Sequence, residues 1–124
     1  MILLDSNTII YLRDPSVAQT IVNQLHNQPL GTCNVIVTEV LGFGKLSKEE
    51  SEYFRQFFET LKNYPFNHTV TNKAIELRKS HQIQIPDAII AATAITNGLT
   101  LWTHNSSDFR DIPELRQFDP LANQ

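Results

Sequence analysis

Short apolar runs alternate with amphipathic stretches along this chain. The run at residues 1–4 has the composition of a buried strand, and further short strands are expected at residues 30–33, 64–66 and 99–103 and near residues 117–118. The stretches between them predict helices, at residues 15–27, 35–45, 47–61, 71–79 and 86–97. Strands that alternate with helices in this way predict a parallel sheet covered by helices on both faces.

Several of these helices carry recognisable end signals. Ser47 and Glu50 stand three residues apart before the aromatic helix, which is a capping-box pattern. Thr71 is expected to cap the next helix, and Pro86 is expected to open the last one. Gly98 follows that last helix directly and is expected to end it.

The length and composition favour one domain over residues 1–124. The chain has 124 residues, of which 41% are hydrophobic, enough for one core and too few for two. The first residues lack the basic start and long apolar stretch of a signal peptide, and no run approaches the roughly 20 apolar residues that span a bilayer. We therefore expect a cytoplasmic protein without a membrane segment. The single cysteine, Cys33, cannot form an internal disulfide and is expected to be a small packing residue.

The charge balance does not by itself indicate a nucleic-acid partner. The formal net charge is −3, with 10 Lys and Arg against 13 Asp and Glu, so no basic surplus is present. A cluster of carboxylates lowers the net charge, and divalent ions bound to it restore the attraction for phosphate. A phosphate-directed site built from acids is therefore compatible with this composition.

Polar residues follow two of the predicted strands. Asp5 comes directly after the first strand, and Thr103, His104 and Asn105 come at the end of the fourth. Asp87 lies in the first turn of the last helix. Carboxyl ends of parallel strands meet at one edge of the sheet, where ligands bind, so these residues are expected to share that edge. Taken alone, Asp5 could be a helix cap and Asp87 a favourable charge near a helix N-terminus.

Two further acids are candidates on weaker grounds. Glu39 falls beside the apolar stripe of its helix, so its carboxylate is expected to be partly buried, with a metal or an internal salt bridge as its partner. Asp108 could equally be a turn residue. Acidic oxygens suit hard cations such as Mg²⁺ or Mn²⁺, whereas zinc prefers histidine and cysteine at short spacings. The four histidines are scattered, at His26, His68, His81 and His104.

Four short motifs together resemble a known family. They are ILLDSN at residues 2–7, TE at residues 38–39, PDAIIAATA at residues 86–94 and THNSSDF at residues 103–109. In this order and spacing they resemble the PIN-domain ribonucleases, and within them the VapC-like toxins of type II toxin–antitoxin pairs. The resemblance covers nearly the whole chain.

The resemblance implies a three-layer α/β/α sandwich around a mainly parallel sheet of four to five strands. It also implies an endoribonuclease that hydrolyses RNA with one or two Mg²⁺ or Mn²⁺ ions. The implied metal ligands are Asp5, Glu39, Asp87 and Asp108. The implied polar support comes from Asn7, Thr103 and Asn105. His104 stands where the family often has Arg, which weakens the expected phosphate contact there; it could instead assist in proton transfer, touch substrate or lie on the surface.

The resemblance further implies two kinds of protein partner. Members of the family commonly form homodimers and are inhibited by a cognate antitoxin whose tail enters the cleft. An aromatic helix face is the candidate contact surface, formed by Tyr53, Phe54, Phe57 and Phe58. The same face could equally be ordinary core.

Two other functions remain as alternatives. The first strand ends in an aspartate, Asp5. A strand of this kind is also found in phosphatases of the haloacid-dehalogenase type, in which a second Asp two residues later is the acid. Asn7 occupies that place here, and an amide cannot donate the proton. A domain that only binds RNA or protein would keep the same fold without needing a metal, and it would tolerate Asp5→Asn or Asp87→Asn.

Overall fold

A five-stranded parallel sheet forms the centre of the computed structural model, which describes residues 1–122. The strands are β1 (Ile2–Leu4), β2 (Leu30–Thr32), β3 (Lys62–Asn63), β4 (Thr100–Trp102) and β5 (Gln117–Phe118). Their order is β3-β2-β1-β4-β5, and every neighbouring pair is parallel. The parallel sheet expected from the sequence is therefore confirmed.

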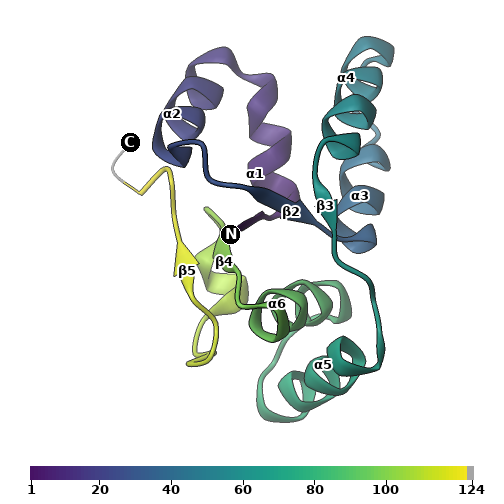
Figure 1. The fold of residues 1–124 in the computed structure, drawn as a ribbon, viewed down its shortest axis with the longest axis vertical. Coiled ribbons are helices and arrows are strands. Elements are labelled where there is room, and N and C mark those ends of the chain that lie inside the picture. Colours follow the sequence, from purple (N-terminus) through teal and green to yellow (C-terminus); the bar gives the residue numbers. More distant parts are fainter. Residues whose placement is uncertain (123–124) are drawn as a thin grey trace.

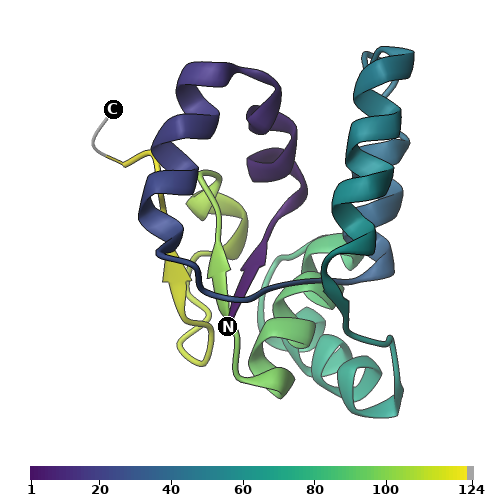
Figure 2. The ribbon, with the colours of Figure 1, turned by 45° about the horizontal axis from the view of Figure 1, so that its top comes forward.

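Helices lie on both sides of this sheet. They are α1 (Ser6–Ile10), α2 (Pro15–Leu25), α3 (Asn34–Leu41), α4 (Lys48–Glu59), α5 (His68–Ser80) and α6 (Ile85–Asn97), with 3₁₀ turns η1 (Tyr11–Arg13) and η2 (Ser106–Phe109). The α1–α2 pair and the α5–α6 pair lie on opposite sides of the strands, and α3 and α4 stand side by side next to the β2–β3 edge (Figures 1 and 2). This arrangement is the expected three-layer α/β/α sandwich.

Helix α6 contains the longest run of buried residues in the described part of the chain. Residues 88–94 are all buried, because α6 packs against both α5 and the sheet. Pro86 lies in its first turn, where a missing N–H costs nothing, and Gly98 ends it with φ 67°. That left-handed conformation favours glycine, so the predicted end of the helix is confirmed. Asp87 is thereby fixed at the amino end of a rigid element.

The predicted boundaries of α3 and α5 are wrong in ways that have local causes. Helix α3 ends at Leu41 rather than at residue 45, because the next N–H, that of Phe43, donates to the Val40 carbonyl oxygen three residues back instead of continuing the four-residue pattern. Helix α5 is capped by Asn67 rather than Thr71. The Asn67 side chain accepts from the Val70 N–H, and the hydroxyl of Thr71, inside the helix, donates to the Asn67 carbonyl oxygen.

The third strand also lies earlier than predicted. It comprises Lys62–Asn63 instead of residues 64–66. The Tyr64 N–H still donates to the Thr32 carbonyl oxygen at 2.8 Å, but Pro65 has no N–H with which to continue the ladder. In contrast, the capping box of α4 is confirmed, since Ser47 and Glu50 exchange both of its hydrogen bonds. Among residues 1–122, none of the helices combines the length and apolar character needed to cross a membrane.

The close contact of β2 with an aromatic ring leads to a stability prediction. A Cβ atom added at Gly31 would lie 2.5 Å from the Tyr64 ring, whereas one added at Gly44 would meet nothing within 4 Å. We expect Gly31→Ala to lower the free energy of unfolding by about 1 to 3 kcal/mol, since the buried ring must shift. Gly44→Ala should change it by less than about 1 kcal/mol. Urea unfolding of both variants measures the difference, and equal stabilities would contradict this packing.

Candidate functional site

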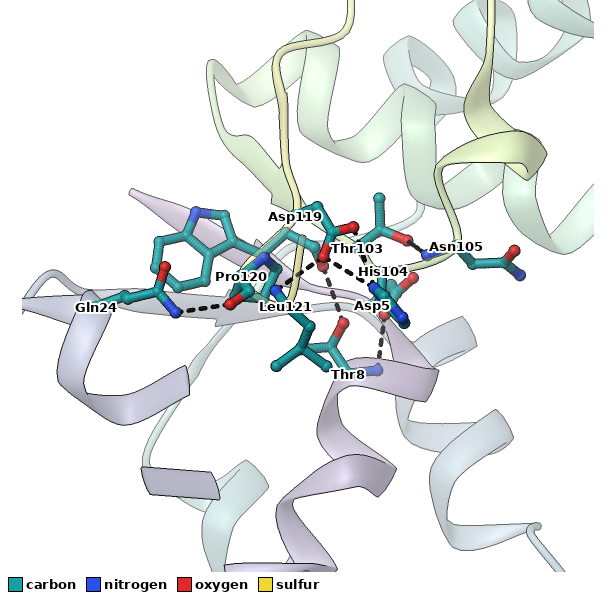
Figure 3. A network of polar contacts seen from close by, with 10 residues as sticks. Asp5, Thr8, Gln24, Thr103, His104, Asn105, Asp119, Pro120 and Leu121 are labelled. Carbon is teal, nitrogen blue, oxygen red and sulfur yellow. Dashed lines mark hydrogen bonds and ion pairs between the residues drawn. The ribbon is translucent and has the colours of Figure 1, made fainter. Parts of the chain in front are cut away.

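Asp5 lies at the carboxyl end of β1, in the middle of the sheet. Its backbone N–H continues the ladder by donating to the Trp102 carbonyl oxygen, and its Oδ1 accepts from the Thr8 N–H at 2.8 Å (Figure 3). The side chain is buried, with 5% of the residue exposed. Asp5 therefore does cap α1, as its simplest interpretation proposed. The cap uses one carboxylate oxygen and fixes the direction of the other.

Asp87 is electrostatically linked to the other candidate acids. The pKa of the Asp87 carboxyl is raised to about 6, first by burial and then by the negative charges of nearby carboxylates. In decreasing order of effect, these are Asp108, Glu39 and Asp5. Four acids from separate parts of the sequence thus face a common space, in which each makes ionisation of Asp87 less favourable.

Glu39 is more exposed than its position on the helix predicted. Its neighbours Ile36 and Val40 are fully buried, but Glu39 itself is exposed at the side of α3. Its Oε1 accepts a hydrogen bond from the Ser6 hydroxyl on α1. The expectation of a partly buried carboxylate is wrong, and with it the inference that burial demands a metal or a salt bridge. What brings Glu39 to the site is the packing of α3 against α1.

The loop after β4 brings Asp108 to the same edge of the sheet as the other acids. The Asn105 amide donates to Asp108 Oδ2, so Asn105, which directly precedes η2, holds this carboxylate in place. The Thr103 hydroxyl in turn accepts from the Asn105 N–H at 3.0 Å (Figure 3). Thr103 is buried beneath the loop, with 1% exposed, and contributes to its shape rather than to the surface of the site.

These side chains surround one cavity of about 160 Å³. Its polar lining comes from Asp5, Ser6, Asn7, Glu39, Asp87, Asn105 and Asp108. Its apolar walls come from Ile10, Phe43, Ile90 and Phe109. Of the seven residues named from the sequence, six line the cavity, and Thr103 supports it from below. Ser6 was not assigned a role from the sequence, although its position in the first turn after Asp5 was a local signal for it.

The donor set suits a hard cation, although the acids do not close around a single point. All the charged groups that line the cavity are carboxylates, the ligand type that Mg²⁺ and Mn²⁺ take. Within residues 1–122, no three His, Cys, Asp or Glu side chains form a ready-made metal site. The carboxylates are spread around the cavity, and two of them are held at its sides by Ser6 and Asn105.

His104 lies beside the cavity and not in its lining. Its Nδ1 is 3.0 Å from Asp119 Oδ1, which also accepts from the Leu121 N–H (Figure 3). The Tyr11 ring meets the imidazole edge-on, with 6.0 Å between ring centroids. The C-terminal segment thus holds the His104 side chain in place next to the site loop.

The aromatic face of α4 divides into core and surface. Phe54 is fully buried, whereas Tyr53 is 58% exposed. Phe57 and Phe58 are partly buried and pack against the core. The interpretation of this face as ordinary core therefore holds for Phe54. Of the four aromatic residues, only Tyr53 is exposed enough to serve as a contact surface.

Comparisons with known proteins agree with this geometry. The PIN domain family model matches residues 2–115. A chain of a toxin–antitoxin complex from Klebsiella pneumoniae aligns with a TM-score of 0.80 and 24% identity, covering 97% of this chain and 98% of that chain. A chain of VapBC-1 from nontypeable Haemophilus influenzae aligns with a TM-score of 0.76 and 27% identity, covering 98% and 99%.

A third similar structure is VapBC2 from Rickettsia felis bound to a DNA fragment from its promoter, with a TM-score of 0.77 and 23% identity. It covers 96% of this chain and 100% of that chain. No curated protein matches the chain. The family model spans most of the sequence, and the fold is shared over the full length of these neighbours. This chain therefore belongs to the PIN domain family.

Proposed function

We propose that this chain is a metal-dependent endoribonuclease and the toxin of a toxin–antitoxin pair. The observation that carries the proposal is the cavity at the carboxyl edge of the sheet, where acids from β1, α3, α6 and the β4 loop surround about 160 Å³. The pKa of Asp87, raised first by burial and then by the surrounding carboxylates, supports it, because a cation would relieve the repulsion among these acids. Membership of the PIN domain family is a second line of support.

In this proposal Asp5, Glu39, Asp87 and Asp108 hold one or two Mg²⁺ or Mn²⁺ ions. When bound, such an ion supplies positive charge for the phosphate and makes a nearby water more acidic. Asp5 can contribute its Oδ2, because Oδ1 is engaged in the cap of α1.

The remaining polar residues orient these acids. Ser6 and Asn105 donate hydrogen bonds to Glu39 and Asp108, which fixes carboxylates that would otherwise move apart by repulsion. Thr103 holds the backbone from which Asn105 extends. Asn7 lines the cavity and can donate its amide hydrogens to a phosphate oxygen.

The antitoxin partner is inferred from the solved structures that share this fold. The similar solved structures include toxin–antitoxin complexes, and three of the similar structures are bound to DNA. A protein inhibitor encoded beside this chain is therefore the expected partner. The homodimer remains a prediction from the resemblance, and the cytoplasmic location remains a prediction from the sequence.

Metal removal is the direct test of the proposed function. We expect the purified chain to cleave total bacterial RNA in Mg²⁺ or Mn²⁺, because a cation is needed to bring phosphate into an acidic cavity. Excess EDTA should abolish cleavage, and adding back the metal should restore it. Gel analysis of the RNA after fixed times measures this, and the product of a neighbouring small reading frame should inhibit the reaction when added.

Three possible results of this experiment distinguish the nuclease from the non-catalytic domain and from the phosphatase. Cleavage that continues in excess EDTA would refute a metal mechanism. RNA that is bound but never cleaved with any divalent metal would favour the non-catalytic alternative. A phosphatase should instead release phosphate from p-nitrophenyl phosphate, and we expect no such release.

A further inference from the structure

Two grooves open from the carboxylate cavity in different directions. One, here called the Arg13 groove, has a volume of about 600 Å³ and shares Asn7, Ile10 and Phe43 with the cavity. The other, here called the Arg110 groove, has a volume of about 390 Å³ and shares Asp108 with it. The two grooves therefore border the cavity through shared lining residues, with the acids between them.

The Arg13 groove presents a fixed cation and an exposed aromatic ring. The Arg13 guanidinium lies over the Phe43 ring, with 5.2 Å from its Cζ to the ring centroid. Its Nε is 3.4 Å from the Ile10 carbonyl oxygen, and its Nη1 is 3.6 Å from Glu50 Oε1. These contacts hold the guanidinium in place while its second terminal nitrogen can still donate. Tyr11, beside it, is 40% exposed.

The acids in the Arg13 groove already have local partners. Asp14 caps α2 by accepting from the N–H and hydroxyl of Ser16 at 3.0 Å. Glu50 accepts from the Ser47 N–H in the capping box of α4. Hydrogen bonds lower the pKa of both carboxyls, so both acids remain charged and hydrogen-bonded to the protein. Among the residues that line this groove, Arg13 is the cation, paired with Glu50 at 3.6 Å, and Tyr11 is the exposed aromatic ring, so these two are the groups that suit an anionic ligand with aromatic bases.

The Arg110 groove supplies a second cation on the far side of Asp108. Arg110 is exposed and follows η2 directly. The wall of the groove is fixed at His81, whose Nε2 lies 2.6 Å from the Asp111 carbonyl oxygen. The two arginines therefore lie in separate grooves, with the acids between them.

We propose that a single-stranded RNA segment lies across these three hollows, with Arg13 and Arg110 binding phosphates on either side of the scissile bond. Tyr11 provides a stacking surface for a base. Single-stranded RNA is the fitting ligand because it offers phosphates and unpaired bases at short intervals, which guanidinium groups and exposed aromatics recognise. In a chain of net charge −3, local cations must supply the attraction that a basic surface would otherwise give. The inference rests on the proposed function.

The test is RNA binding by arginine variants in an Asp87→Asn background, in which cleavage is expected to be lost. The probe is a fluorescein-labelled single-stranded RNA of about 12 nucleotides, a length within the range of single-strand binding sites. We expect Arg13→Gln or Arg110→Gln to raise Kd about tenfold in fluorescence anisotropy. Each should reduce the slope of log Kd against log salt by about 0.7, the value for one phosphate contact on a single strand. Tyr11→Ala should raise Kd about tenfold without changing the slope.

Arg55→Gln is the matched control, because Arg55 is exposed on α4 and lines neither groove. It should leave both Kd and the slope unchanged. In the cleaving protein, Arg13→Gln should raise KM while kcat stays within about twofold, as expected for a contact made equally in the ground and transition states.

Several outcomes would overturn the proposed path. If the wild type cleaves RNA but neither arginine variant changes Kd or the salt slope, the path is wrong and the proposed function stands. If Arg13→Gln weakens only the binding of the inhibitor protein, the Arg13 groove holds that protein instead of RNA. If the wild type does not cleave RNA at all, the path fails together with the proposed function.

Discussion

Asp5→Asn should lower the rate of RNA cleavage about a thousandfold while leaving the fold intact. The expected loss corresponds to roughly 4 kcal/mol of transition-state stabilisation, the scale of a lost metal-binding carboxylate. The fold should survive because Asn caps a helix as well as Asp does, so the hydrogen bond from the Thr8 N–H is kept. Activity and stability are thus expected to separate at this position.

The measurement is the initial rate of RNA cleavage at saturating Mg²⁺, together with thermal unfolding of each protein. Glu52→Gln is the matched control, because it also converts an acid to its amide, on an exposed part of α4 away from the cavity. The control should retain the wild-type rate. Equal rates for wild type and Asp5→Asn would show that Asp5 does not take part in catalysis.

Asp87→Asn should abolish cleavage and at the same time stabilise the metal-free protein. The pKa of Asp87 is raised from 3.8 to about 6, first by burial and then by the surrounding acids. The folded state therefore holds this proton more tightly than the unfolded state, and stability falls as pH rises from about 4 to 6. Above pH 6 the ionised group destabilises the fold, by about 1 kcal/mol after allowance for its partial exposure.

Urea unfolding in EDTA at pH 7.5 and at pH 3.5 tests the sign of this effect. The variant should be more stable than wild type at pH 7.5 and nearly equal to it at pH 3.5, where Asp87 is protonated in the folded state and mostly protonated in the unfolded state. Added Mg²⁺ should stabilise the wild type and have a smaller effect on the variant, because the ion binds the folded site. A variant that is less stable at pH 7.5 would show that Asp87 is not held in a repulsive cluster.

Local signals in the sequence were reliable where a few neighbouring residues determine the structure. The capping box of Ser47 and Glu50 and the end of α6 at Gly98 were predicted correctly, because each depends on backbone geometry within one turn. The start of α5 was predicted wrongly at Thr71, because both Thr and Asn can cap a helix and the local sequence does not decide between them. The burial of Val70 and Ala74, which sets where the helix begins, is a tertiary effect.

The site likewise has features that the local sequence determines and features that depend on tertiary packing. The sequence by itself determined the alternation of strands and helices, and therefore that Asp5, Asp87 and the loop after β4 would meet at one edge of a parallel sheet. Only the tertiary structure decided that Glu39 is exposed, that Ser6 holds it, and that Arg13 lies in a groove joined to the cavity. The physical reason is that the alternation of strands and helices follows from a repeating local pattern, whereas contacts between α1, α3 and η1 depend on side-chain packing between elements distant in sequence.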